Sequence, residues 1–321
     1  MGKGGVVIFS IAIILMLASF SSAGVLDWFG KITGKATSQN TNVTVTISGS
    51  NAVTIEVFNN TLTGAAVDPS ADTTKAIAVI VRVNDSDGYL DINTTSVTVN
   101  FSRSGEVARI NNSCTDLSQS TTYSRNFSCT VDMWYYDDAS VWTINVAAKD
   151  LGNMTLIVNS STVFTFGSLQ SIRLSPSSVT FPSSAQGAVN ITSNNDPTLI
   201  NNSGNFNFTF INITAYNLYG ETTTSEFINV ANITVGNNTN GANAGPECDV
   251  SPALGANATI LSNGTQVNVK HSILTRGNHS INNNQTGQEQ TFYCFRTIPT
   301  GITSQTYSSG YIGGWVVWAN P

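Results

Sequence analysis

Three aspartates in the segment NDSDGYLD, residues 84–91, have side chains that could bind a cation. Asp85, Asp87 and Asp91 surround an Asp-Gly pair, and carboxylate oxygens are preferred ligands of calcium. A calcium loop of the Asp-x-Asp-x-Asp-Gly type also needs a carboxylate four residues before Asp87, where the chain has Val83. The set is therefore incomplete, and Asp-Gly is ordinary turn chemistry. We expect no metal and no cofactor, and we keep Asp85, Asp87 and Asp91 only as a calcium candidate.

Side chains suited to catalysis are few. The sequence contains no Gly-x-Ser-x-Gly, His-Glu-x-x-His or phosphate-binding glycine motif. Asp137 and Asp138 follow the aromatic run at 134–136, and a carboxylate pair beside aromatic rings would suit glycoside hydrolysis. Neighbouring residues in a strand or turn point apart, which favours a hairpin turn here. We expect no enzymatic activity.

Tryptophan side chains offer a second chemistry, which is the stacking of sugar rings. Trp134, Trp142, Trp315 and Trp318 could form such a platform, although tryptophans of a β-sandwich usually belong to its core. Trp315 and Trp318 are three residues apart, so on one strand they face opposite sides. This spacing is the best argument for an adhesin that binds glycans.

Asn-X-Ser/Thr triplets, the acceptors of N-linked glycans, begin at about 19 positions, roughly twice the number expected by chance. Eight have an apolar middle residue, which in a strand points inward while Asn and the hydroxyl point outward. A strand surface built from Asn and Thr without any sugar would give the same alternation. The predicted acceptors are Asn42, Asn93, Asn100, Asn126, Asn153, Asn190, Asn207, Asn212 and Asn232.

The four cysteines indicate disulfides of an oxidising compartment. Cys114 and Cys129 are 15 residues apart, whereas Cys248 and Cys294 are 46 apart. Four cysteines allow three pairings, and we favour the one that keeps each pair within its own domain. A metal site is the rival interpretation, but the chain has no Cys-x-x-Cys and only two histidines.

The N-terminus has the layout of a secretory signal peptide. Lys3 precedes an apolar run from Val6 to Phe20, and small residues follow up to Ala23. Two alternatives stay open. The apolar run extended to Leu26 would make an uncleaved anchor, and Lys3-Gly4-Gly5 loosely resembles an archaeal pilin processing site. In every case we expect the mature chain, after a linker at 24–41, to lie outside the cell.

Period-two alternation of apolar residues dominates the rest of the chain and predicts an all-β protein. It marks strands at 76–83, 96–102 and 141–148, then at 226–235, 265–273, 290–298 and 311–319. In NFNFTFINITAY, Phe206, Phe208 and Phe210 are predicted to share one face before the phase slips at Ile211. We expect two β-sandwich domains in series, at 42–166 and 167–321, behind an N-terminal hydrophobic signal helix at 1–23.

Several phrases resemble secreted Ig-like surface glycoproteins of small uncultivated archaea. They are VNDSDGYLDINTTSVTVNFS (83–102), FSCTVDMWYYDDASVWTINVAAKD (127–150), GVLDWFGKITGKATSQ (24–39) and TLINNSGNFNF (198–208), the last being similar to adhesion modules. The resemblance implies that both sandwiches are Ig-like. The chain departs from the Ig pattern at Cys114 and Cys129, because an Ig disulfide links strands that are far apart in sequence.

The expected role is that of an N-glycosylated structural protein of the cell surface. Charged residues are only 10% of the chain, and a net charge of −6 argues against nucleic acid or anionic membrane as a partner. The expected partners are envelope components, other cell-surface glycoproteins or glycans, and contact with the membrane would be made only through an uncleaved N-terminal helix. An adhesin-type binding module and a pilin-like filament subunit are the alternatives.

Overall fold

The computed structural model describes residues 42, 44–45, 51–57, 62, 66–152, 156–237, 248, 258–281 and 286–321. By its internal contacts the chain divides into Met1–Ile47 and Ser48–Pro321, and every described element lies in the second unit. The predicted signal segment and linker, residues 1–41, lie outside the described residues. No helix in the described part of the chain has the length and apolar character needed to cross a bilayer.

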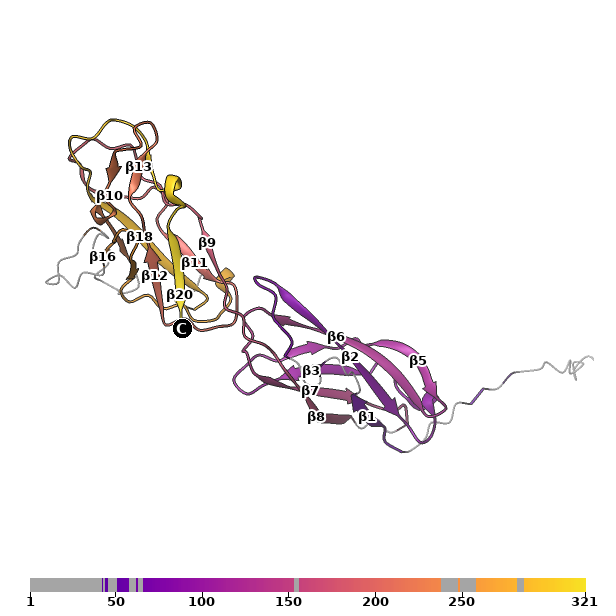
Figure 1. Ribbon diagram of the computed structural model, residues 1–321. Coiled ribbons are helices and arrows are strands. Elements are labelled where there is room, and N and C mark those ends of the chain that lie inside the picture. Colours follow the sequence, from indigo (N-terminus) through magenta and orange to yellow (C-terminus); the bar gives the residue numbers. More distant parts are fainter. Residues whose placement is uncertain are drawn as a thin grey trace, which may run out of the picture. The chain divides into compact units, whose positions relative to one another are not determined.

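The described fold is all-β, as predicted, and consists of antiparallel sheets around two hydrophobic cores. The first core lies between two four-stranded sheets in an arrangement consistent with a β-sandwich, and its strands carry the indigo and magenta colours of Figure 1. One sheet has the order β1 (Thr54–Val57), β2 (Thr74–Asn84), β6 (Ser124–Trp134), β5 (Thr115–Thr121). The other has the order β4 (Arg109–Asn111), β3 (Thr98–Ser102), β7 (Val141–Ala148), β8 (Ile157–Thr165).

Alternating side chains explain why these segments pair as they do. In β2 and β6 every second residue is buried, including Val79, Val81 and Phe127. Burial on one face of each strand fixes the register, because a slip by one residue would turn every apolar side chain to solvent. The edge strand β5 differs, since all seven of its residues are exposed and its register with β6 shifts twice.

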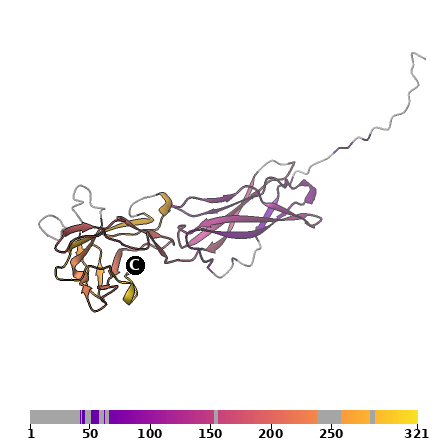
Figure 2. The same ribbon diagram turned by 90° about the horizontal axis from the view of Figure 1, so that it is seen from above.

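The second core is enclosed by shorter strands, coloured from magenta to yellow in Figure 1. The largest sheet has the order β16 (Thr259–Ile260), β15 (Ile233–Gly236), β18 (Gln288–Thr297), β11 (Thr198–Asn202), β9 (Ile172–Ser175), and β10 (Val189–Thr192) also pairs with β18. Two three-stranded sheets complete it: β17 (Gln266–Asn268), β12 (Phe210–Thr214), β20 (Val316–Asn320), and β14 (Phe227–Ile228), β13 (Leu218–Gly220), β19 (Tyr307–Ser308). Figure 2 shows the same strands from above.

The described helical segments are single 3₁₀ turns, and two of them interrupt predicted strands. These turns are η2 (Tyr89–Asp91), η3 (Val230–Asn232), η6 (His279–Ile281) and η7 (Gly310–Ile312). The strand predicted at 226–235 is broken at η3, because the Asn229 side chain accepts a hydrogen bond from the Ala231 amide and caps the turn. The strand predicted at 311–319 begins only at Val316, after two glycines with φ of 103° and 80°.

Two further details of the second core differ from the sequence prediction. The strand predicted at 265–273 ends at Asn268, and His271 has a left-handed φ of 60°. Phe208 is buried, whereas Phe210 is 37% exposed, so the three phenylalanines do not share one face. Ile211, the residue after Phe210, is again buried in the core. The alternation of buried and exposed side chains therefore slips before Phe210, one residue earlier than predicted.

Candidate functional site

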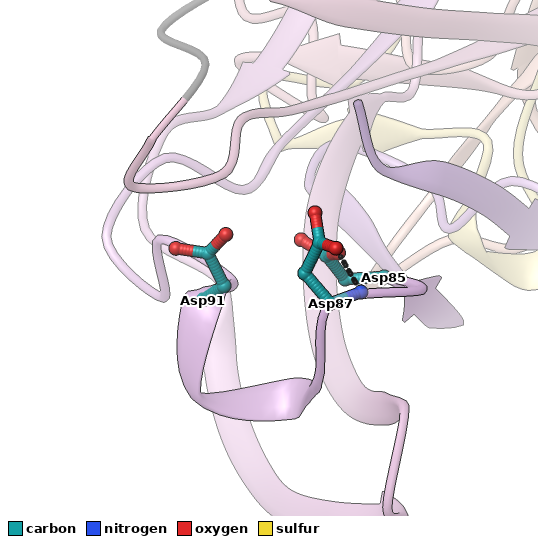
Figure 3. A group of neighbouring side chains, drawn as sticks. All are labelled: Asp85, Asp87 and Asp91. Atoms are coloured by element: carbon teal, nitrogen blue, oxygen red, sulfur yellow. Dashed lines mark hydrogen bonds between the residues drawn. The ribbon is translucent and has the colours of Figure 1, made fainter. Parts of the chain in front are cut away.

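The aspartates of the NDSDGYLD segment lie where β2 leaves its sheet. The chain turns after Asn84, with the Gly88 amide donating to the Asp85 carbonyl and the Asp91 amide donating to the Gly88 carbonyl. Gly88 has a φ of 120°, a conformation that side-chain-bearing residues rarely adopt. This tight path brings Asp85, Asp87 and Asp91 to one side of the turn (Figure 3).

The three carboxylates are close together, although their burial differs. One oxygen from each lies within 4.8 Å of the others. Asp85 and Asp91 are buried, at 1% and 7% exposure, and Asp87 is exposed. The Asp87 amide donates to Asp85 Oδ1 at 2.8 Å, the contact drawn in Figure 3. Both Asp87 oxygens accept hydrogen bonds from Asn51, through its amide at 2.8 Å and its Nδ2 at 2.9 Å.

A fourth carboxylate, which the sequence did not reveal, lies near these three and acts electrostatically on Asp85. Asp150 is 1% exposed and lies just after β7, where it forms a bridge with Ile92. The Leu151 amide donates to the Asp91 carbonyl at 2.7 Å and so ties the two segments together. We call Asp85, Asp87, Asp91 and Asp150 the aspartate cluster. Nothing local in the sequence predicts that Asp150 joins it, because strand pairing brings it there.

The pKa of the Asp85 carboxyl is raised, first by burial and then by the neighbouring carboxylates. Burial raises the pKa of the Asp85 carboxyl, and the hydrogen bond from the Asp87 amide opposes this effect. Repulsion from Asp91, Asp87 and Asp150 raises the pKa of Asp85 further. A cation bound among these side chains would therefore offset the repulsion between the carboxylates.

The disulfides are the predicted ones. Cys114 pairs with Cys129, whose Cα lies 4.5 Å away, and Cys248 pairs with Cys294, with Cα atoms 5.2 Å apart. Cys129 lies on β6 and is fully buried, so the first bridge joins β6 to the residue before its neighbour β5. As expected from the departure from the Ig pattern, this bridge fastens neighbouring strands of one sheet.

The predicted glycan acceptors lie at the protein surface wherever the structure describes them. Asn42, Asn190 and Asn207 are exposed, and Asn93, Asn100, Asn126, Asn212 and Asn232 are partly exposed. Asn153 lies outside the described residues. The middle residues Phe101, Phe127, Phe208, Ile213 and Ile233 are all buried, and Ile191 is partly buried. The predicted alternation of acceptor outside and apolar residue inside therefore holds for the triplets on strands, at Asn100, Asn126, Asn190 and Asn212. In the Asn232 triplet it fails, because the hydroxyl residue Thr234 is buried together with Ile233.

Two other triplets have a buried asparagine. Asn201 is 4% exposed and Asn237 is 3% exposed. The side chain of Asn201 accepts a hydrogen bond from Gln288, and that of Asn237 donates to the His271 carbonyl. A glycan on either asparagine is incompatible with this packing. The triplet pattern alone could not separate these positions from the exposed ones.

Asn93 has a local geometry suited to an acceptor. Thr95, the hydroxyl residue of its triplet, donates to Asn93 Oδ1 through both its amide, at 3.2 Å, and its Oγ1, at 2.8 Å. The carbonyl half of the side-chain amide is thereby held in place. The Nδ2 atom, to which a glycan is joined, forms no hydrogen bond within the described part of the chain.

The tryptophans divide between core and surface. Trp142 is fully buried, and Trp134 is 40% exposed and stacks on Tyr136. Trp315 donates from Nε1 to the Tyr216 carbonyl and packs against the second core, whereas Trp318 is 48% exposed. Trp315 lies just before β20 (Val316–Asn320), so the two side chains do not share a strand as predicted, although Trp315 packs inward and Trp318 is largely exposed.

Trp318 belongs to a polar and aromatic surface on the sheet β17–β12–β20. We call the outward side chains of these strands the β12 face, and they are Phe210, Asn212, Thr214, Gln266, Asn268, Val316 and Trp318. Trp318 lies opposite Asn212 and donates from Nε1 to Thr214 Oγ1 at 3.1 Å. A shallow hollow of about 580 Å³ lies beside it, lined by Phe210, Asn212, Gln266 and Asn268 among others.

Asp137 and Asp138 form a turn, and each pairs with a different arginine. The Asp137 amide donates to the Trp134 carbonyl at 3.0 Å, which closes the turn. The fully buried Asp137 carboxylate binds Arg109, and Asp138 pairs with Arg103. These ion pairs give both carboxylates a structural role.

No protein-family model, curated protein or solved structure matches this chain, so no relative supplies a role for any of the groups described above.

Proposed function

We propose that this protein is a secreted, N-glycosylated structural component of the cell surface or envelope, without catalytic activity. It would consist of two Ig-like β-sandwich domains, at 42–166 and 167–321, as in the archaeal secreted glycoproteins that the sequence resembles. The two hydrophobic cores support two domains. The two disulfides are compatible with an extracellular location.

The observation that carries the proposal is the position of the acceptor asparagines. Every described member of the predicted set is exposed or partly exposed, and four of them, Asn100, Asn126, Asn190 and Asn212, lie on strands. Asparagine is disfavoured in strands, so its repeated use at such positions calls for a reason. Glycans supply that reason, because bulky hydrophilic groups replace the charge that this surface lacks.

Intact-mass measurement of the full chain from its native source tests the proposal. We expect a mass far above the 34.0 kDa of the polypeptide, which falls on deglycosylation, and we expect the protein in the envelope fraction. Site-resolved peptide mapping adds an internal control. The exposed Asn190 and Asn207 should carry sugar, whereas the buried Asn201 and Asn237 should not. A soluble protein of polypeptide mass would refute the proposal.

The β12 face favours a second candidate function, which is the binding of glycans on a partner surface. A half-exposed tryptophan beside side-chain amides and an open hollow offers ring stacking and hydrogen bonds, the contacts by which sugars are recognised. Binding of the chain to immobilised glycans would be lost in Trp318→Ala. The matched control is Tyr311→Ala, which removes an exposed aromatic side chain from η7. Equal binding by both variants would exclude the β12 face as the binding surface.

A further inference from the structure

The aspartate cluster contains a buried oxygen atom that lacks a partner. Asp85 is 1% exposed, and its Oδ1 accepts the hydrogen bond from the Asp87 amide. Its Oδ2 is buried and has no hydrogen-bond partner among the described residues. A buried carboxylate oxygen without a donor is costly, because it has lost water and gained nothing in exchange. This atom points to a ligand, independently of the closeness of the other carboxylates.

We propose that the aspartate cluster binds one calcium ion, with Asp85, Asp91 and Asp150 as the buried ligands and Asp87 on the solvent side. This inference goes beyond the proposed function and does not depend on it. Calcium accepts six to eight oxygen ligands in a flexible arrangement, and the carboxylates of the cluster supply oxygen only. The Asp-x-Asp-x-Asp-Gly motif fails here because Asp150, which lies 59 residues beyond Asp91, takes part in its place.

The spacing and burial of the carboxylates favour calcium over magnesium. Calcium–oxygen distances of about 2.3–2.6 Å place ligands on opposite sides of the ion roughly 4.6–5.2 Å apart, whereas those of magnesium lie about 4.0–4.2 Å apart. The carboxylate oxygens of Asp85, Asp87 and Asp91 lie within 4.8 Å of one another. That upper limit leaves room for the longer calcium–oxygen distances. Magnesium would also need to keep several waters, which a site lined by buried carboxylates does not favour.

A bound ion would join elements from the two sheets of the first core. Asp85 follows β2 of one sheet, and Asp150 follows β7 of the other. The segments already meet through the Leu151 amide and through the Asn93 amide, which donates to the Lys149 carbonyl at 3.0 Å. Calcium would add ionic bonds to these hydrogen bonds and so stabilise the folded state selectively.

Thermal unfolding of the full chain with both disulfides intact tests the site. We expect the unfolding midpoint to rise by about 5–10 °C between a chelator and calcium at roughly a hundred times its dissociation constant, and to change little with magnesium at the same concentration. Asp85→Asn and Asp150→Asn should each abolish the calcium-dependent rise. Asp132→Asn, which changes an exposed aspartate of β6, should retain it.

The calcium-dependent rise is measured within each variant, so a general loss of stability does not hide the result. Calorimetric titration with calcium supplies a second readout, with one site per chain expected in the parent and a much weaker or undetectable site in Asp85→Asn. Absence of a calcium-dependent rise in the parent chain would overturn the proposal. So would an equal rise with magnesium, or a full rise in Asp150→Asn.

Discussion

Glu289 of β18 gives a pH dependence of stability whose sign and size can be worked out. Its side chain is fully buried. The Ile273 amide donates to Oε2 at 2.8 Å, and the Gln290 amide donates to Oε1 at 2.9 Å. Burial outweighs these two hydrogen bonds and raises the pKa of the Glu289 carboxyl from 4.5 to about 7.

The direction of the effect follows from where the proton is held. Below pH 4.5, the ordinary value, Glu289 is protonated in both the folded and the unfolded chain. Between pH 4.5 and about 7 only the folded chain keeps the proton, so the free energy of unfolding falls as pH rises. Each pKa unit corresponds to about 1.4 kcal/mol, which gives a total loss of about 3 kcal/mol by neutral pH.

Denaturant unfolding of the parent and of Glu289→Gln at pH 4.5, 6 and 8 measures this loss. Glutamine carries no charge at any of these values, so the stability of the variant relative to the parent should rise by about 3 kcal/mol across the range. Glu221→Gln, at an exposed position, controls for the substitution itself. A difference between parent and Glu289→Gln that is constant from pH 4.5 to 8 would refute the reasoning.

Three further changes have defined outcomes. Replacing both Cys114 and Cys129 by alanine should lower the free energy of unfolding by about 3 kcal/mol, as closure of a 15-residue loop implies; an unchanged denaturation midpoint would contradict this. Asp137→Ala leaves its arginine partner without a buried counter-charge and should lower the free energy of unfolding by about 3–5 kcal/mol, against less than about 0.5 for exposed Asp132→Ala. Asn93→Gln should lower the intact mass by one glycan; retention of the full mass would exclude this acceptor.

Local patterns predicted the strands better than they predicted the meeting of distant segments. Apolar residues at every second position are visible in the sequence, which is why β2, β3 and β7 were predicted near their true bounds. The break at η3 was missed, because the capping hydrogen bond of Asn229 overrides an apolar alternation that continues through it. The Asn229 side chain thus interrupts the strand, although the alternation of apolar residues in the sequence continues.

The candidate site shows the same limit. The incomplete motif around Asp87 argued against calcium, because a linear motif includes only ligands that are near in sequence. Asp150 becomes a neighbour only after β7 and the turn beyond β2 are brought together. The burial that leaves Asp85 Oδ2 without a donor is likewise a property of packing. The acceptor asparagines on strands, such as Asn100 and Asn126, required no such information, because strand alternation places their side chains outside.

The edge strand β5 has a consequence for how such chains coexist at high density. An unprotected edge offers free backbone donors and acceptors to a neighbouring molecule and promotes sheet-to-sheet aggregation. In β5 the register with β6 shifts between Asp116 and Gln119 and again before Thr121, and Ser118 has a positive φ of 79°. This irregular backbone is a poor template for a straight incoming strand. Crowded copies with few repelling charges would therefore remain separate at this edge.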